Sequence, residues 1–141
     1  MGERIGSSIR FGGKLTQEKA NELIELIKAE CLTVDFDEST GPDLTNLGET
    51  FGDWEVNYGN LDALTNFAAE NGLAYEHWFD SGPDWNQGFY KRDLTGRWED
   101  AEGTPDNPLF SAKQIKQIGF EKLDELVEWF AAPIGPLEIA S

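Results

Sequence analysis

The chain has 141 residues, with 27 aspartates and glutamates against 11 lysines and arginines, and its formal net charge at pH 7 is −16. A surface this acidic repels nucleic-acid phosphates and anionic lipids, so the composition argues against direct nucleic-acid binding and against a membrane target. The length fits a single acidic domain over residues 1–141, long enough to bury a hydrophobic core.

The remaining composition is typical of a folded protein in a reducing compartment. Hydrophobic residues make up 39% of the chain and five residues are tryptophan, whereas acidic disordered segments are poor in aromatic residues. Cys31 is the single cysteine, which excludes an intramolecular disulfide and a cysteine-based zinc site. Residues 1–13 lack the apolar segment of a signal peptide, and no apolar run approaches the roughly 20 residues that span a membrane. We therefore expect a cytoplasmic protein.

The first third of the chain predicts a strand, a helix and a second strand. Residues 7–11 favour a short strand, and Thr16 is a suitable N-cap for a helix over residues 17–30 with an apolar face at i, i+3, i+4 and i+7 spacing. Residues 32–37 alternate between apolar and polar side chains, which predicts a half-buried strand. Cys31, between helix and strand, is expected to be a small buried residue.

The middle of the chain repeats this pattern after a loop over residues 39–52. Residues 53–58 alternate, with Trp54 and Val56 expected in the core. Asn60 is expected to cap a helix that stops at residues 71–72, and residues 73–80 predict another strand.

Two consecutive βαβ units predict an α+β fold, a ferredoxin-like βαββαβ sandwich with both helices on one face of the sheet. A C-terminal extension is expected to follow. Residues 88–93 and 96–100 predict a hairpin, and residues 102–108 a polar loop. The capping-box pair Ser111 and Gln114 opens a helix that Gly119 interrupts, before a last helix ends near Pro133.

No catalytic or metal-binding motif stands out. His77 is the only histidine and lies within a predicted strand, where we expect a packed side chain. The segment that begins at Asp35 resembles a calcium loop at its start, but Thr40 and Asn46 stand where an EF-hand needs glycine and glutamate. We therefore expect a protein without enzymatic activity, cofactor or metal, with a metal-dependent hydrolase as the alternative if clustered carboxylates bind Mg²⁺.

The carboxylates are the most informative feature. No lysine or arginine occurs between Lys28 and Lys91, a stretch that holds thirteen aspartates and glutamates. With the apolar positions of the strands facing the helices, Asp35, Asp37, Asp53 and Glu55 are expected in rows on the helix-free face of the sheet. The predicted partner-binding residues are Asp35, Asp37, Glu38, Asp43, Glu49, Asp53, Glu55, Asp80, Asp84 and Trp85.

Such a face favours binding to a basic protein surface, because neighbouring charges within a Debye length of about 8 Å reinforce one another. The first hypothesis is a nucleic-acid mimic that inhibits a nucleic-acid-binding effector or nuclease. In size and composition the chain is similar in type to the anti-CRISPR and anti-restriction inhibitors of phages and plasmids, without a shared motif. The alternative is an adaptor or immunity protein for one basic partner, a nuclease toxin for example, bound mainly through aromatic anchors such as Trp85, Phe89 and Trp98.

Overall fold

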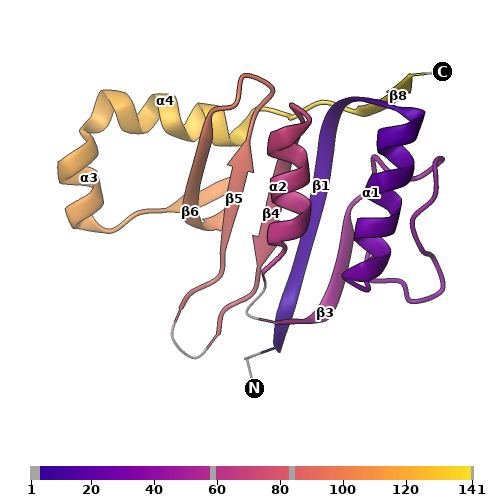
Figure 1. The fold of residues 1–141 in the computed structure, drawn as a ribbon. Coiled ribbons are helices and arrows are strands. Elements are labelled where there is room, and N and C mark those ends of the chain that lie inside the picture. The colour runs from indigo at the N-terminus through magenta and orange to yellow at the C-terminus, as the bar shows by residue number, and fades with distance from the viewer. Residues whose placement is uncertain (1–3, 58–59, 83–84, 141) are drawn as a thin grey trace.

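The computed structural model describes residues 4–57, 60–82 and 85–140. It shows one largely antiparallel sheet with helices on both faces (Figure 1). The strands are β1 (Arg4–Thr16), β2 (Thr33–Val34), β3 (Phe51–Asn57), β4 (Ala74–Phe79), β5 (Gly88–Arg92), β6 (Trp98–Thr104), β7 (Asn107–Leu109) and β8 (Leu137–Ala140). The helices are α1 (Gln17–Ala29), α2 (Asp62–Glu70), α3 (Ala112–Ile118) and α4 (Phe120–Ala131).

The predicted mixed α+β class with an antiparallel sheet and several helices is confirmed. The sheet as a whole differs from a four-stranded ferredoxin-like sandwich. Within the described residues it has eight strands in the order β2-β3-β1-β4-β5-β6-β7, and β8 pairs in parallel with the end of β1. The predicted hairpin is present as β5 and β6, but the expected loop at 102–108 is instead the turn into β7.

Helices α1 and α2 cover one face of the sheet and close the main core. α1 begins at the predicted cap, where Thr16 Oγ1 accepts a hydrogen bond from the Lys19 amide at 3.2 Å. Its buried stripe packs on the β1 side chains Ile9 and Phe11, neither of which is exposed to solvent. Cys31, two residues beyond the end of α1, has a φ of 60°. The expectation of a buried Cys31 is wrong, because this left-handed position beyond the helix end leaves the side chain exposed.

The predicted strand over residues 32–37 is cut short after two residues. Asp35 and Phe36 both have positive φ, 48° and 63°, which turns the chain away from the sheet and sends Phe36 back over β3. A Cβ at Gly52 would lie 2.6 Å from the Phe36 ring, so only glycine leaves room for this contact. Phe36 then stacks on Trp54 at a ring-centroid distance of 4.3 Å.

Trp54 is therefore not in the core, contrary to the sequence prediction, and 63% of its surface is exposed. The cause is an irregularity in the β1–β3 pairing, where Ile5 pairs with Val56 but Ser7 pairs with Asp53. The extra residue in β3 changes which alternate positions face inward. Val56 and Phe51 reach the core, and Trp54 is left on the surface.

The C-terminal helices lie on the opposite face of the sheet. α3 opens with the predicted capping box of Ser111 and Gln114, and Gly119 separates it from α4 at a φ of 84°. α4 reaches the sheet only at its C-terminal end, where Phe130 packs edge-on against Phe89 of β5 at 4.8 Å. Phe120, at its other end, is 78% exposed. The chain then folds back as β8.

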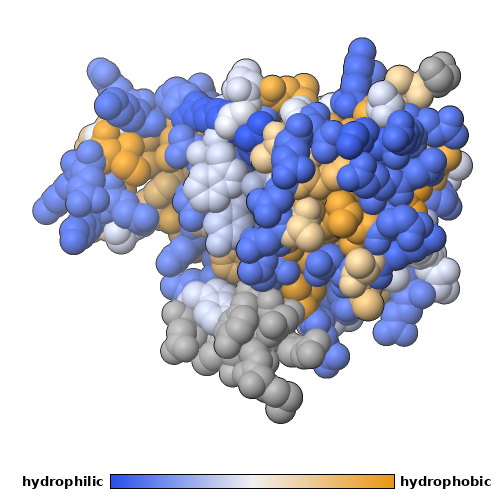
Figure 2. Space-filling view, in the orientation of Figure 1, coloured by the Kyte–Doolittle hydropathy of each residue, from blue (hydrophilic) through white to orange (hydrophobic). Residues whose placement is uncertain are grey.

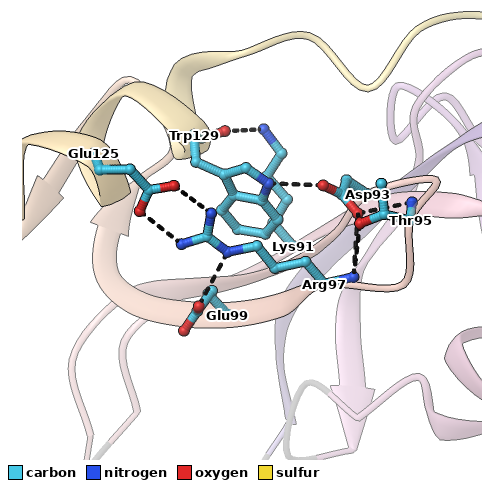
Figure 3. Close-up of polar contacts among 7 residues, drawn as sticks. All are labelled: Lys91, Asp93, Thr95, Arg97, Glu99, Glu125 and Trp129. Atoms are coloured by element: carbon cyan, nitrogen blue, oxygen red, sulfur yellow. Dashed lines mark hydrogen bonds and ion pairs between the residues drawn. The ribbon is translucent and has the colours of Figure 1, made fainter. Parts of the chain in front are cut away.

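A buried lysine fixes the end of α4 on the sheet. Lys91 is 1% exposed, and its Nζ donates to the carbonyl oxygens of Trp129 (2.6 Å), Phe130 (3.1 Å) and Ala132 (2.5 Å). These carbonyls lie at the C-terminus of α4, where unpaired acceptors and the negative end of the helix dipole favour a cation. Trp129 Nε1 donates to Asp93 Oδ2 at 2.8 Å, beside the pair that Arg97 forms with Glu125 (Figure 3).

Lys91 also belongs to a row of alternating charges that crosses four strands beneath α4. In register, Arg10 of β1 pairs with Glu76 of β4, Glu76 pairs with Lys91 of β5, and Lys91 pairs with Glu99 of β6. Burial raises the pKa of Glu76 and lowers the pKa of Lys91, although each charge partly offsets the effect on the other. Desolvation thus outweighs attraction within the row, as is common for buried ion pairs.

Replacement of this lysine tests its role. We expect Lys91→Met to lower the free energy of unfolding by about 3 to 5 kcal/mol, because it leaves the α4 carbonyls without their donor and Glu76 without one of its cations. Urea unfolding followed by circular dichroism measures the change.

Lys122→Met is the matched control, since Lys122 is exposed on α4 itself. It should change the stability by no more than about 0.5 kcal/mol. Equal stabilities of the two variants would contradict the assigned role of Lys91.

Candidate functional site

The predicted carboxylates gather mainly at one edge of the sheet. We use the name acidic edge for the β2–β3 loop over residues 35–50 together with residues 53–55 of β3. β2 and β3 are the outermost strands on this side of the sheet. The exposed carboxylates of the acidic edge are Asp35, Asp37, Glu38, Asp43, Glu49 and Glu55, and Asp53 is half-buried.

Two of these carboxylates also hold the loop in shape. Asp37 Oδ1 accepts hydrogen bonds from the Ser39 hydroxyl (2.7 Å) and amide (3.0 Å), and Oδ2 accepts from Thr40 Oγ1. Asp43 Oδ1 accepts in the same way from the hydroxyl and amide of Thr45. These bonds lower the pKa of Asp37 and of Asp43. The largest contribution comes from the Ser39 hydroxyl at Asp37 and from the Thr45 hydroxyl at Asp43. Both groups are therefore ionised at neutral pH and remain so in mild acid.

No cation of the described residues neutralises this edge. The ion pairs among the described residues all lie outside the acidic edge. They join Arg10 to Glu76, Lys14 to Glu138, Lys19 to Glu22, Lys28 to Glu25, and Arg97 to both Glu99 and Glu125. The reason is visible in the sequence, since the segment between Lys28 and Lys91 contains no base. Among the described side chains, the edge carboxylates therefore have no ion-pair partner.

The Trp54–Phe36 stack lies on the same acidic edge. Trp54 stands in the sequence between Asp53 and Glu55, and its ring lies against Phe36, which itself lies between Asp35 and Asp37. Sequence reasoning missed Trp54 as a surface residue. The signal that could have found it is its position between two acidic residues.

The expected rows of carboxylates on the helix-free face are not present. Asp35 and Asp37 lie in the turn after β2, and Asp53 pairs with Ser7, on the face that α1 and α2 cover. The helix-free face is instead occupied by α4 and by the backbone of residues 134–135, which passes over Gly12.

Two of the remaining predicted site residues, Asp80 and Trp85, follow the end of β4. The side chain of Asp80 occupies the space beside Gly6 that a Cβ there would need, close to the Trp54 ring, so Asp80 extends the acidic edge. Asp84 lies outside the described residues. Trp85 does not join the acidic edge; its Nε1 donates to the Asp80 carbonyl at 3.1 Å, and its ring lines a pocket on the α2 face.

That pocket is a second candidate site, with a volume of about 650 Å³. Residues of β4, β5, β6 and α2 line it, together with Asn60 and Trp85. Pale side chains, the colour of tyrosine and tryptophan on this scale, are visible beside α2 in the orientation of Figure 1 (Figure 2). Asn60, Thr65 and Asn66 supply polar groups at its α2 side.

The one histidine lies beside a buried serine. Ser7 Oγ lies 2.8 Å from His77 Nε2 and is also within hydrogen-bond distance of the Trp78 carbonyl, at 3.0 Å. The tautomer of His77 decides which atom donates in the Ser7–His77 bond. Ser7 is also only 1% exposed. Over residues 4–57, 60–82 and 85–140, no three histidine, cysteine, aspartate or glutamate side chains come together as metal ligands.

No family model, curated protein or solved structure matches the chain. No helix among the described residues is long and apolar enough to cross a membrane.

The hydrogen bonds of the loop predict a measurable titration. Ser39→Ala removes the largest cause of the low Asp37 pKa, so we expect that pKa to rise toward its ordinary value of 3.8. A lowered carboxyl pKa contributes stability that is present above 3.8 and lost as pH falls through the folded value, and the variant should lose part of it. Carboxyl ¹³C NMR titration measures the change. Ser81→Ala, at another exposed serine, should leave the pKa of Asp37 unchanged, and an equal effect of both variants would refute the assignment.

Proposed function

We propose that the chain binds a basic protein surface through its acidic edge and thereby competes with nucleic acid for that surface. The partner is a nucleic-acid-binding effector or nuclease, and the chain is its inhibitor. The observation that supports this proposal is the set of exposed edge carboxylates that no cation of the described residues neutralises.

The physical argument rests on the field of the edge. A groove that receives nucleic acid is lined with lysine and arginine, because a duplex presents a negative charge about every 1.7 Å along its axis. A folded surface with closely spaced carboxylates produces a field of the same sign. Asp37 and Asp43 add to it, because their low pKa values keep them ionised. Such a field speeds encounter with a basic groove and weakens as salt increases. The role is one of binding and involves no catalysis.

A second candidate has a specific observation in its favour. Trp54 is 63% exposed and stacked on Phe36, and tryptophan is among the commonest residues to dominate binding energy at interfaces. In an adaptor or immunity protein for one basic partner, this aromatic pair would supply most of the affinity. Binding would then survive high salt, unlike binding by the field alone.

We propose further that residues 4–79 form a ferredoxin-like βαββαβ unit that supports this edge. The support is that β2-β3-β1-β4 are neighbours in this order, all antiparallel, with α1 and α2 as the connections from β1 to β2 and from β3 to β4. β5 to β8, α3 and α4 are then additions to that unit.

Charge neutralisation at two places separates the edge from general acidity. The edge variant carries Asp35→Asn, Glu38→Gln, Glu49→Gln and Glu55→Gln, which spares the loop-holding Asp37 and Asp43. The matched control carries Asp106→Asn, Glu121→Gln, Asp124→Asn and Glu128→Gln, all exposed positions elsewhere on the surface. Each variant loses four negative charges. We expect the edge variant to bind a fluorescent nona-arginine peptide about tenfold more weakly at low salt, and the control within about twofold of wild type.

Competition with nucleic acid is measured with the same peptide bound to a labelled DNA duplex. The wild-type protein should release the DNA, the edge variant should do so poorly, and release should decline with added salt. Equal losses in both variants would sink the proposal, since acidity at any place would then suffice. The adaptor would be favoured if the wild-type protein still binds the peptide at high salt and Trp54→Ala does not.

A further inference from the structure

The pocket on the α2 face is a binding site distinct from the acidic edge, and the geometry points to an alkylated ammonium ion as its ligand. The ammonium group is the shared chemistry of a choline-like small molecule and of a methylated lysine side chain. The inference does not rest on the proposed function, because the pocket and the acidic edge have no residue in common.

The pocket is built mainly from aromatic rings. They come from β4, β5 and β6 and from residue 85, which the sheet brings together, and they are Tyr75, His77, Phe79, Trp85, Tyr90 and Trp98. Tyr90 lies at their centre, 5.4 Å from both His77 and Phe79 and stacked on Trp98 at 5.5 Å. The tyrosine, phenylalanine and tryptophan rings present faces with negative electrostatic potential, and several such faces around one space attract a cation.

Hydrogen bonding within the wall strengthens this preference. Trp98 Nε1 donates to the Tyr75 hydroxyl at 2.9 Å, so the indole N–H is directed at its neighbour. Trp98 remains 47% exposed even with this bond. Its side chain is held at the entrance on β6, and the ring surface is the part that a ligand can contact.

Two carboxylates near the rings add negative charge to the surroundings of the pocket. Asp62 lines the pocket from the first position of α2, and Asp100 of β6 pairs with Tyr90 in register. Burial first, and then the charges of Asp100 and Asp62, raise the pKa of Tyr90, so both carboxylates act on the central ring. The full charge of Asp62 exceeds the roughly half unit of positive charge at the N-terminus of α2.

The same features disfavour an anionic ligand. The described lining contains no lysine or arginine. Arg92, the base of β5 two residues from Tyr90 and so on the same face of the strand, directs its Nε at the Leu73 carbonyl at 3.3 Å. A phosphate-bearing ligand would have no cationic partner in this lining and would meet Asp62. An ordinary ammonium ion is strongly hydrated, whereas an alkylated one gives up water easily and fits aromatic faces, which favours the alkylated form.

Calorimetric titration of the full chain with choline and with its neutral isostere 3,3-dimethylbutanol tests the inference. The two compounds share shape and differ in charge, so we expect choline to bind at least about tenfold more tightly. Asp62→Asn and Trp98→Ala should each weaken choline binding several-fold. Trp54→Ala removes a more exposed tryptophan outside the pocket and should leave choline binding unchanged. The edge variant should also bind choline normally, which keeps this test independent of the acidic edge.

Peptides that carry trimethyl-lysine or unmodified lysine identify the source of the ammonium group. Tighter binding of the trimethylated peptide than of choline indicates a protein ligand, and the reverse indicates a small molecule; both support the cation site. Equal binding of choline and its neutral isostere would overturn it, as would tighter binding of adenosine monophosphate or no binding of any cation. Asp62→Asn keeps the test valid if Trp98→Ala fails to fold, because Asp62 is exposed on the first turn of α2.

Discussion

The buried ammonium group of Lys91 is the contact on which the second half of the structure depends. It donates to three carbonyl oxygens at the end of α4, and Lys91 stands in register between Glu76 of β4 and Glu99 of β6. Burial raises the pKa of Glu76 and lowers the pKa of Lys91, so desolvation disfavours the charged form of each. The contacts of Lys91 help to fix the position of α4 on the sheet. They matter because Phe130 is the only buried residue of this helix.

The charge asymmetry of the molecule follows from where its cations are used. Lys91 donates to carbonyls at the end of α4, Arg10 pairs with Glu76, and Arg97 pairs with Glu99 and Glu125. The Arg97 guanidinium also lies over the Trp129 ring, at 4.6 Å. These cations all serve the face that carries α4. The acidic edge lies at the β2–β3 end of the sheet, and the segment that forms it contains no lysine or arginine. A protein with the same net charge but evenly placed lysines would lack such an edge.

Local rules predicted the elements that depend on neighbouring residues: α1 with its Thr16 cap, the capping box at Ser111, the break at Gly119 and the β5–β6 hairpin. They were wrong where a distant contact decides. The extra residue in β3 exposes Trp54, and strand parity cannot reveal it. The positive φ of Asp35 and Phe36 ends β2 early; aspartate tolerates this conformation, but phenylalanine gives no turn signal. The role of Lys91 was also beyond reach, because its acceptors lie about 40 residues away along the chain. The acidic segment itself was visible from sequence; its place at a sheet edge was not.

Both candidate sites combine aromatic rings with carboxylates, and both therefore select cations, but on different length scales. At the acidic edge the carboxylates are exposed and a single ring pair projects among them, so long-range attraction dominates and salt weakens it. In the pocket the rings enclose the ligand and two carboxylates act at short range, so dispersion and the ring quadrupoles dominate and salt matters less. A polybasic surface suits the first and a single alkylated ammonium ion suits the second. The response of each binding event to salt thus reports which of the two surfaces a given ligand occupies.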